Sequence, residues 1–196
     1  MPFRTGLIPP PELISPHFYL RPITAGDAEQ DFAAVMESRE YLRFWEQSTW
    51  PRDDFTVSEN RDDLKSLELR HMQNAGFTYT VLDPAQQECL GCVYLLPADA
   101  PSFTTAAITP LDGAAWGQRE AAVYFWVRKS QVALRTDAVL LEALQTWLAS
   151  EWDLGGHLFV TNEQFGQQVG LFEASGMLPH FKIEEAGKPG AYFAYA

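Results

Sequence analysis

Apolar residues recur along this chain at two spacings, one typical of strands and one typical of helices. Seven segments are rich in β-branched and aromatic residues, which predicts strands over residues 17–23, 76–84, 88–97, 119–128, 157–161, 177–185 and 190–196. Four segments place apolar residues every three or four positions, which predicts helices over residues 27–38, 57–74, 136–153 and 163–175. The resulting order, β-α-α-β-β-β-α-β-α-β-β, predicts one α/β domain with a mixed, mostly antiparallel sheet flanked by helices.

Three segments show neither spacing. Residues 1–16 are rich in proline, so we expect an extended N-terminal arm outside the core and a domain that spans 17–196. Residues 41–51 are rich in aromatic side chains and are expected to form a turn. Residues 98–118, rich in Ala, Thr, Pro and Gly, are longer than an ordinary connection, which predicts an inserted loop.

Composition and charge exclude several classes of protein. The 196 residues are 46% hydrophobic and 20% charged, which is typical of a folded globular chain of about one domain. A net charge of -12 disfavours nucleic acid as a partner and mildly favours a cationic substrate. No apolar run approaches the roughly 18 residues of a membrane span, and prolines interrupt the start where a signal peptide would be apolar. We therefore expect a cytoplasmic protein with no membrane partner.

Cysteine and histidine spacing gives no indication of a metal site. Cys89 and Cys92 form a CxxC, but it lies in a predicted strand, where positions three apart point to opposite faces. The four histidines are scattered and match no zinc-binding spacing. We therefore expect no metal.

The order of elements, together with three local strings, resembles the GNAT superfamily of N-acetyltransferases over nearly the whole chain. These strings are LRPITAGDAEQ, AAVYFWVRKS leading to AVLLEALQTWL, and LFEASGM. The resemblance implies an acyl-CoA N-acyltransferase-like fold, with acetyl-CoA as the acyl-donor substrate. It also implies transfer of an acetyl group, by direct attack, to a primary amine of a small molecule or of a protein N-terminus.

The resemblance places the pantetheine arm of CoA beside the strand over residues 119–128. Phe125, Trp126 and Val127 would offer main-chain groups to the arm and to the thioester oxygen. We therefore expect the strand that ends at Val127 to diverge from the strand that ends near Val160. The FWV string equally fits a core strand that binds nothing.

The resemblance places the CoA pyrophosphate at the turn that follows this strand. The glycine-rich signature of the family is absent, and Arg135 and Asp137 stand where glycines are expected. Because Arg128, Lys129 and Arg135 concentrate positive charge here in an acidic chain, we expect these side chains and Thr136 to hold the phosphates. Capping of the helix by Thr136, with Asp137 as a favourable first-turn acid, is the alternative.

Acid-base groups are less well matched to the resemblance. Glu120 is the candidate base that would deprotonate the amine, although a solvated acid at the strand end explains it equally well. Phe172 stands where many relatives carry a tyrosine that protonates the leaving thiolate, and phenylalanine donates no proton. Trp45 and Trp50 lie on the expected acceptor side, where aromatic rings attract a cationic amine or simply pack in a core.

Two other interpretations remain beside the enzyme. A GNAT-fold protein that has lost catalysis and serves as a ligand-binding or interaction domain fits the missing glycines and the missing tyrosine. An unrelated α/β domain would require the order of elements to be a coincidence. The sequence also leaves open whether the sheet pairs across a homodimer.

Overall fold

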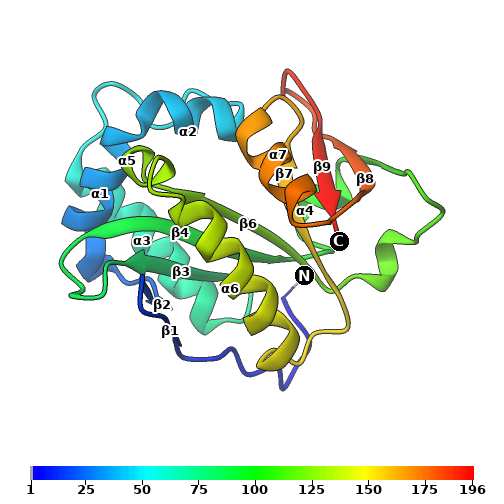
Figure 1. Cartoon of the computed structure of the whole chain (residues 1–196), viewed down its shortest axis with the longest axis horizontal. Helices are drawn as coiled ribbons and strands as arrows, with labels where there is room; N and C mark the ends of the chain where they lie inside the picture. The colour runs from blue at the N-terminus through cyan, green and yellow to red at the C-terminus, as the bar shows by residue number, and fades with distance from the viewer. Residues whose placement is uncertain (1) are drawn as a thin grey trace.

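Nine strands form one sheet in the order β1-β2-β3-β4-β6-β7-β9-β8-β5 (Figure 1). The computed structural model describes residues 2–196. The strands are β1 (Leu13–Ile14), β2 (Tyr19–Pro22), β3 (Phe77–Leu82), β4 (Cys89–Pro97), β5 (Ala107–Pro110), β6 (Ala121–Val127), β7 (His157–Asn162), β8 (Pro179–Glu184) and β9 (Tyr192–Tyr195). Within the described residues β6 and β7 are the only parallel pair, so the predicted mixed, mostly antiparallel sheet is confirmed.

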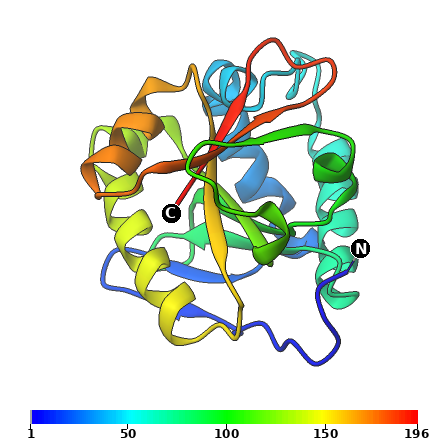
Figure 2. The same cartoon turned by 90° about the vertical axis from the view of Figure 1, so that its right-hand side faces the viewer.

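Helices cover both faces of the sheet, as the view along its edge shows (Figure 2). They are α1 (Ala28–Glu37), α2 (Arg39–Glu46), α3 (Val57–Met72), α4 (Pro101–Thr104), α5 (Lys129–Val132), α6 (Thr136–Ser150) and α7 (Gly166–Ala174), with 3-10 turns at Ala25–Asp27 and Trp116–Gln118. Helices α1, α2 and α3 pack on one face, and α6 and α7 pack on the other. Thr56 and Glu59 form a reciprocal capping box that fixes the start of α3.

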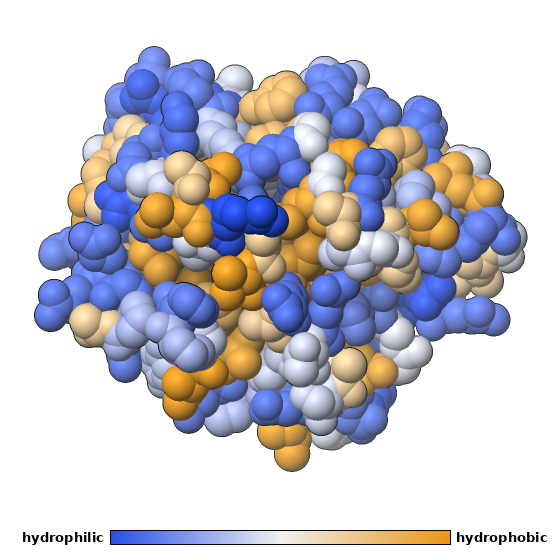
Figure 3. Space-filling view, in the orientation of Figure 1, coloured by the Kyte–Doolittle hydropathy of each residue, from blue (hydrophilic) through white to orange (hydrophobic). Residues whose placement is uncertain are grey.

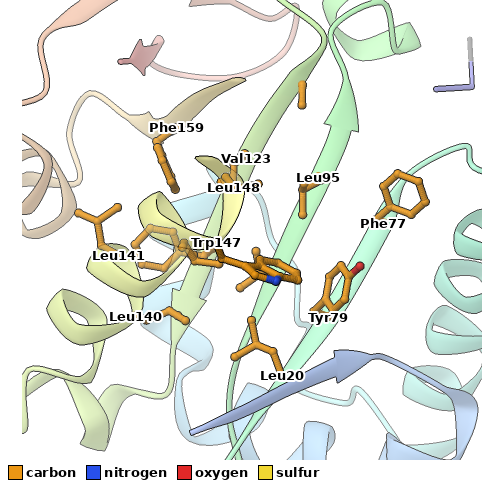
Figure 4. Close-up of a cluster of buried hydrophobic side chains, with 14 of the residues drawn as sticks. Leu20, Phe77, Tyr79, Leu95, Val123, Leu140, Leu141, Trp147, Leu148 and Phe159 are labelled. Atoms are coloured by element: carbon orange, nitrogen blue, oxygen red, sulfur yellow. The ribbon is translucent and has the colours of Figure 1, made fainter. Parts of the chain in front are cut away.

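The largest core lies between the sheet and α6 (Figure 4). The indole ring of Trp147 in α6 meets the ring of Tyr79 in β3 edge-on, with ring centroids 5.1 Å apart. Leu20 and Leu95 belong to the same cluster, and both are fully buried. The four leucines at helical spacing in α6 therefore bury one face of that helix against the sheet.

Residues of β6 alternate between the two faces of the sheet. Val123, Phe125 and Val127 belong to the core under α6, whereas Trp126 packs with α1 and α2 on the opposite face. This alternation follows from the two-residue period of a strand. A ligand on either face of the sheet would therefore meet a different set of β6 side chains.

The N-terminal arm is part of the core, so the expectation that residues 1–16 lie outside it is wrong. Phe3 and Leu7 are buried in the largest core, and the ring of Phe3 stacks on Phe77 at a centroid distance of 4.8 Å. Leu13 and Ile14 add an edge strand to the sheet. Met1 lies outside the described residues. Prolines keep this segment extended, but its apolar side chains still lose water contact by packing on β3.

Two segments expected to be irregular contain regular elements. Most of the predicted aromatic turn over 41–51 is helical, because α2 ends at Glu46. The predicted inserted loop over 98–118 contains α4 and β5, and β5 pairs antiparallel with β8 at the edge of the sheet. These helices and this strand are short, so tertiary contacts rather than local propensity decide whether they form.

The two cysteines lie on the same face of β4, contrary to the expectation from strand geometry. Val81 pairs with Gly91 and Leu82 pairs with Cys89, so Leu90 is an extra residue in a β-bulge. The bulge shifts the alternation by one position between Cys89 and Cys92. Both thiols are buried and neither forms a disulfide.

No helix within residues 2–196 combines the length and the apolar character that crossing a bilayer requires.

Gly91 allows β4 to approach β6 at the bulge, which gives a test of the fold. A Cβ atom on Gly91 would lie 2.1 Å from the carbonyl oxygen of Trp126, in the backbone of β6. Gly91→Ala is expected to lower the free energy of unfolding by about 3 kcal/mol or more, measured by urea denaturation. The control Gly170→Ala, in α7 with no atom within 4 Å of the new methyl group, should instead stabilise the protein by about 0.5–1 kcal/mol. Equal stability of Gly91→Ala and the native protein would contradict this close approach.

Candidate functional site

Strands β6 and β7 separate halfway along their length. Their parallel pairing runs from Ala121 with His157 to Val123 with Phe159 and then stops, although β6 continues to Val127 and β7 to Asn162. The predicted divergence of these two strands is therefore present. It leaves an opening in the sheet next to the turn that leads into α6.

Main-chain groups of β6 face this opening. The N–H of Arg128 donates to the carbonyl of Leu90 in β4. Because successive residues of a strand point their peptide groups to opposite sides, the residues at odd-numbered positions of β6 point theirs away from β4 and toward β7. Beyond Val123 these residues are Phe125 and Val127, and the carbonyl of Phe125 accepts a hydrogen bond from α7. The N–H groups of Phe125 and Val127 consequently point toward the gap, where they can donate to a bound carbonyl oxygen.

Gln168 of α7 bridges the opening. Its Nε2 donates to the carbonyl oxygen of Phe125 at 2.9 Å. Its Oε1 accepts from the Nε1 of Trp45 at 3.1 Å and from the hydroxyl of Thr161 at 2.6 Å. This buried amide therefore links β6, β7, α2 and α7. Gln168 is not among the site residues expected from the sequence, although one signal is present: it is a polar residue on the apolar stripe between Phe165 and Phe172.

The turn between β6 and α6 is held by side chains of α1 and of the residue that follows it. The Nε of Arg128 donates to Glu37 at 2.6 Å, and the N–H of Ser130 donates to the same carboxylate at 3.2 Å. The N–H of Lys129 donates to the hydroxyl of Ser38 at 2.9 Å. Arg128 is thus part of an ion pair that stabilises the turn.

Arg135 differs from Arg128 in its surroundings. It directly precedes α6 with φ of +60°, a left-handed conformation that favours glycine. Its side chain is exposed, and no carboxylate within residues 2–196 forms an ion pair with it. The hydroxyl of Thr136 donates to Oε1 of Gln131 at 3.0 Å instead of capping the helix. Arg135 and Lys129, whose side chains are both exposed and form no ion pair within residues 2–196, are therefore the cations of this turn that are available for an anionic ligand.

Asp137 occupies the first turn of α6. Its Oδ1 accepts from the N–H of Ala138 at 2.9 Å and its Oδ2 accepts from Nε2 of Gln167 at 2.7 Å. The carboxylate is buried, so it complements the positive end of the helix dipole. A phosphate at the same place would meet this negative charge.

A cavity of about 480 Å³ lies on the opposite face of the sheet, between the sheet and helices α2 and α3. Trp45 and Trp50, both expected on the acceptor side, lie in its wall together with Ser102 of the inserted segment. The other lining residues are Glu46, Asp63, Ser66, Leu67, Arg70, Gly76, Thr78, Tyr94, Leu96, Tyr124, Glu185, Lys188 and Tyr192. Tyr124 follows Val123, so the cavity wall reaches the point where β6 and β7 separate.

Carboxyl groups in this cavity carry perturbed pKa values. Burial raises the pKa of Glu185, and the negative charge of Glu46 raises it further, while Lys188 acts in the opposite direction. Burial also raises the pKa of Asp63, which accepts a hydrogen bond from Trp50. A half-buried carboxyl with a raised pKa exchanges its proton at a higher pH than an exposed carboxyl does.

Glu120 lies away from both the opening and the cavity, so its assignment as the base does not fit the structure. It precedes β6 at the paired end, about 13 Å along the strand from Tyr124 at roughly 3.3 Å per residue. Its Oε2 accepts from the N–H of Gly155 at 2.8 Å, and Arg4 forms an ion pair with it at 3.6 Å. Its side chain therefore joins the N-terminal arm to the turn before β7.

The remaining expected site residues are structural or exposed. Trp126 is buried, and its Nε1 donates to the hydroxyl of Tyr94 at 3.1 Å in the cavity wall. Phe172 is fully buried and packs against the rings of Phe125 and Tyr195. Lys129 is exposed at the start of α5.

The face that carries α5, α6 and α7 shows apolar residues gathered near its centre (Figure 3).

Solved acetyltransferases share this architecture. A ribosomal L7/L12 alpha-N-protein acetyltransferase, RimL, in complex with coenzyme A matches 97% of this chain and 96% of its own with a TM-score of 0.66 at 16% identity. A ribosomal-protein-S5-alanine acetyltransferase from Vibrio fischeri matches 94% of each chain with a TM-score of 0.62 at 14% identity. The microcin C7 self-immunity acetyltransferase MccE, in complex with acetyl-CoA and AMP, matches 91% of each chain with a TM-score of 0.65 at 9% identity.

These matches show that the chain has the acyl-CoA N-acyltransferase fold of the GNAT acetyltransferases. No family model and no curated protein matches its sequence.

The bridge formed by Gln168 makes a prediction about stability. Gln168→Leu removes three hydrogen bonds and leaves the Trp45 N–H and the Phe125 carbonyl buried without a partner. Each such group costs about 1–3 kcal/mol, so the variant should lose at least 2 kcal/mol of unfolding free energy, measured by urea denaturation. The control Glu173→Gln, at an exposed position of the same helix whose side chain forms no hydrogen bond within residues 2–196, should lose less than about 1 kcal/mol. A Gln168→Leu protein as stable as the native one would show that the bridge is not formed.

Proposed function

We propose that this protein is an acetyl-CoA-dependent N-acetyltransferase that acetylates a primary amine of a small molecule or of a protein N-terminus. One observation carries the proposal: the opening between β6 and β7 meets the 480 Å³ cavity at Tyr124. A donor bound at the opening and an amine bound in the cavity would meet where the sheet separates. The fold shared with acetyltransferases supports the same reaction class.

The donor side offers main-chain donors and two exposed cations, Lys129 and Arg135. The N–H groups of Phe125 and Val127 point toward the gap and suit the thioester oxygen as negative charge develops on it. At the turn, the N–H groups of Lys129 and Ser130 already have partners in Ser38 and Glu37. We therefore expect side chains to help hold the pyrophosphate, chiefly Arg135, which directly precedes α6.

The acceptor side suits a cationic amine. Glu46, Asp63 and Glu185 supply negative charge to the cavity wall, and its aromatic side chains supply faces that attract an ammonium group. Two basic residues, Arg70 and Lys188, also line the cavity. The Nζ of Lys188 already donates to the carbonyl of Glu46 at 2.6 Å. An amine with an additional apolar or aromatic group fits the remaining surface best.

Glu185 replaces Glu120 as our candidate base. Its carboxyl lies close enough to Tyr124 to raise the pKa of that phenol, so it lies near the point where the strands separate. In the reaction, the carboxylate of Glu185 takes a proton from the ammonium group, and the neutral amine attacks the thioester carbon. The carbon–sulfur bond then breaks, and the departing CoA thiolate takes up the second proton, which the attacking nitrogen loses as it becomes an amide nitrogen.

The donor site is tested by acetyl-CoA binding measured by calorimetry. The native protein should bind acetyl-CoA, and Arg135→Ala should weaken binding about tenfold or more, because a charge-assisted hydrogen bond contributes about 1.5–3 kcal/mol. Asp137→Asn, which removes a negative charge from the same helix start, should leave binding unchanged or strengthen it.

Lys182→Ala provides the matched control, since Lys182 is a surface cation on β8 that pairs with Glu184. Its affinity for acetyl-CoA should equal that of the native protein. Equal affinity in Arg135→Ala would exclude the side-chain clamp. Absence of acetyl-CoA binding by the native protein would contradict the enzyme assignment itself.

The base is tested by the pH dependence of acetyl transfer to a panel of amines. Because Glu185 must be ionised to accept a proton, and because burial raises its pKa, kcat/KM should fall as the pH drops through that raised pKa. Glu185→Gln should lower kcat by roughly 100-fold or more and remove this acidic limb. The adjacent Glu184→Gln, exposed and paired with Lys182, should keep both kcat and the pH profile. An unchanged profile in Glu185→Gln would exclude Glu185 as the base.

A second candidate function is a binding domain that has lost catalysis. The bridging amide of Gln168 and the buried carboxylate of Asp137 favour it, because both occupy places where a CoA-dependent enzyme would receive its donor. This candidate predicts ligand binding in the cavity without release of CoA thiol. Thiol release in the presence of acetyl-CoA and an amine, followed with a thiol reagent, separates the two functions.

A further inference from the structure

Two thiols and one carboxylate lie together on the α1 side of the sheet. Asp31 of α1 and Cys89 and Cys92 of β4 are each no more than 3% exposed. The Oδ1 of Asp31 lies 3.4 Å from the sulfur of Cys92 and 3.9 Å from the sulfur of Cys89. All three ligand atoms lie within 4.8 Å of one another. None of the three residues lines the cavity, so the proposed acetyl transfer does not use this cluster.

Hydrogen bonding alone compensates this buried carboxylate poorly. Asn60 donates to Oδ2 of Asp31 at 2.9 Å, which leaves Oδ1 facing only the two thiols. A thiol is a weak donor, and a contact of 3.9 Å is long even for sulfur. An ionised carboxylate away from water requires strong partners, and a bound cation would be such a partner.

The spacing of the cluster matches that of metal ligands. In a tetrahedral zinc site with Zn–S near 2.3 Å and Zn–O near 2.0 Å, a sulfur and an oxygen ligand lie about 3.5 Å apart. The two sulfur–oxygen distances measured here bracket this value. Two oxygen atoms near the sulfur of Cys89 are candidates for the fourth ligand. The carbonyl oxygen of Gly91 lies 3.4 Å from this sulfur, and the hydroxyl oxygen of Thr80 lies 3.8 Å from it.

The surroundings also position the ligands. Asn60 holds the carboxylate through Oδ2 while its Nδ2 donates to the carbonyl of Ala28 as well, at 3.0 Å. Such a partner orients a ligand in the same way as the outer hydrogen bonds of known metal sites. The β-bulge at Leu90 brings both sulfurs to the face of β4 that α1 covers.

We propose that Asp31, Cys89 and Cys92 form a structural zinc site, completed by the carbonyl of Gly91 or the hydroxyl of Thr80. Two thiolates favour a soft or borderline ion and the carboxylate favours a harder one, a combination that suits Zn²⁺. Binding releases the two thiol protons to solvent and involves no oxidation or reduction. The ion ties α1 to β4 and contributes to folding rather than to acetyl transfer.

Cobalt provides a spectroscopic test on the full chain. Because the site is buried, the unfolded, reduced and metal-free protein is refolded with Co²⁺ or Zn²⁺ before excess metal is removed. We expect one ion per chain, a thiolate-to-cobalt charge-transfer band, and the loss of that band when Zn²⁺ displaces cobalt. Cys89→Ser, Cys92→Ser and Asp31→Asn should each weaken or abolish the band. The control Asp62→Asn, which changes an exposed acid on α3, should retain it.

Two results would overturn the proposal. The first is native protein that refolds without any bound zinc or cobalt band in the presence of the metal. The second is a disulfide between the two cysteines of the protein as purified, seen as the absence of free thiols after unfolding without reductant. Since both are measured on the native chain, they decide the question even if a cysteine variant fails to fold. Acetyl transfer by metal-free protein would leave the proposed enzymatic function intact.

Discussion

The loss of pairing between β6 and β7 beyond Val123 and Phe159 is the constraint on which the candidate site depends. Paired strands satisfy their own peptide groups, whereas strands that separate leave buried donors and acceptors that need other partners. Gln168 supplies one such partner to the carbonyl of Phe125. The opening therefore persists because a polar side chain from α7 offsets the cost of the missing ladder, and its remaining donors are available to a ligand.

Because side chains alternate along β6, the two faces of the sheet present different groups of this strand. Phe125 and Val127 point their side chains into the core under α6, so only their peptide groups face the opening. Tyr124 points to the other face and forms part of the cavity wall. The same strand thus borders both an edge of free peptide groups and a side-chain-lined pocket, and in the proposed reaction each would hold a different substrate.

Helix α1 links several features that lie far apart in the sequence. Asp31 lies in its first turn, against the two cysteines of β4, and Glu37 at its end holds Arg128 and the turn before α6. The ion pair between Glu37 and Arg128 occupies one of the few basic residues of this turn in a chain with a net charge of -12. The position of α1 on the sheet therefore affects the conformation of the turn to which Arg135 belongs.

Local spacing in the sequence determined the order of the main strands and helices and, through that order, the mixed sheet, because periods of two and 3.6 residues are properties of the chain itself. The role expected for β6 came from the resemblance to a known family. Local spacing did not determine the helix α2, the buried arm, the bulge at Leu90 or the position of Glu120. Each depends on contacts between segments remote in sequence. Gln168 and Phe125, for example, are 43 residues apart. Only the tertiary structure brings such groups within hydrogen-bonding distance, because packing of whole elements, rather than the spacing of neighbours, decides which side chains meet.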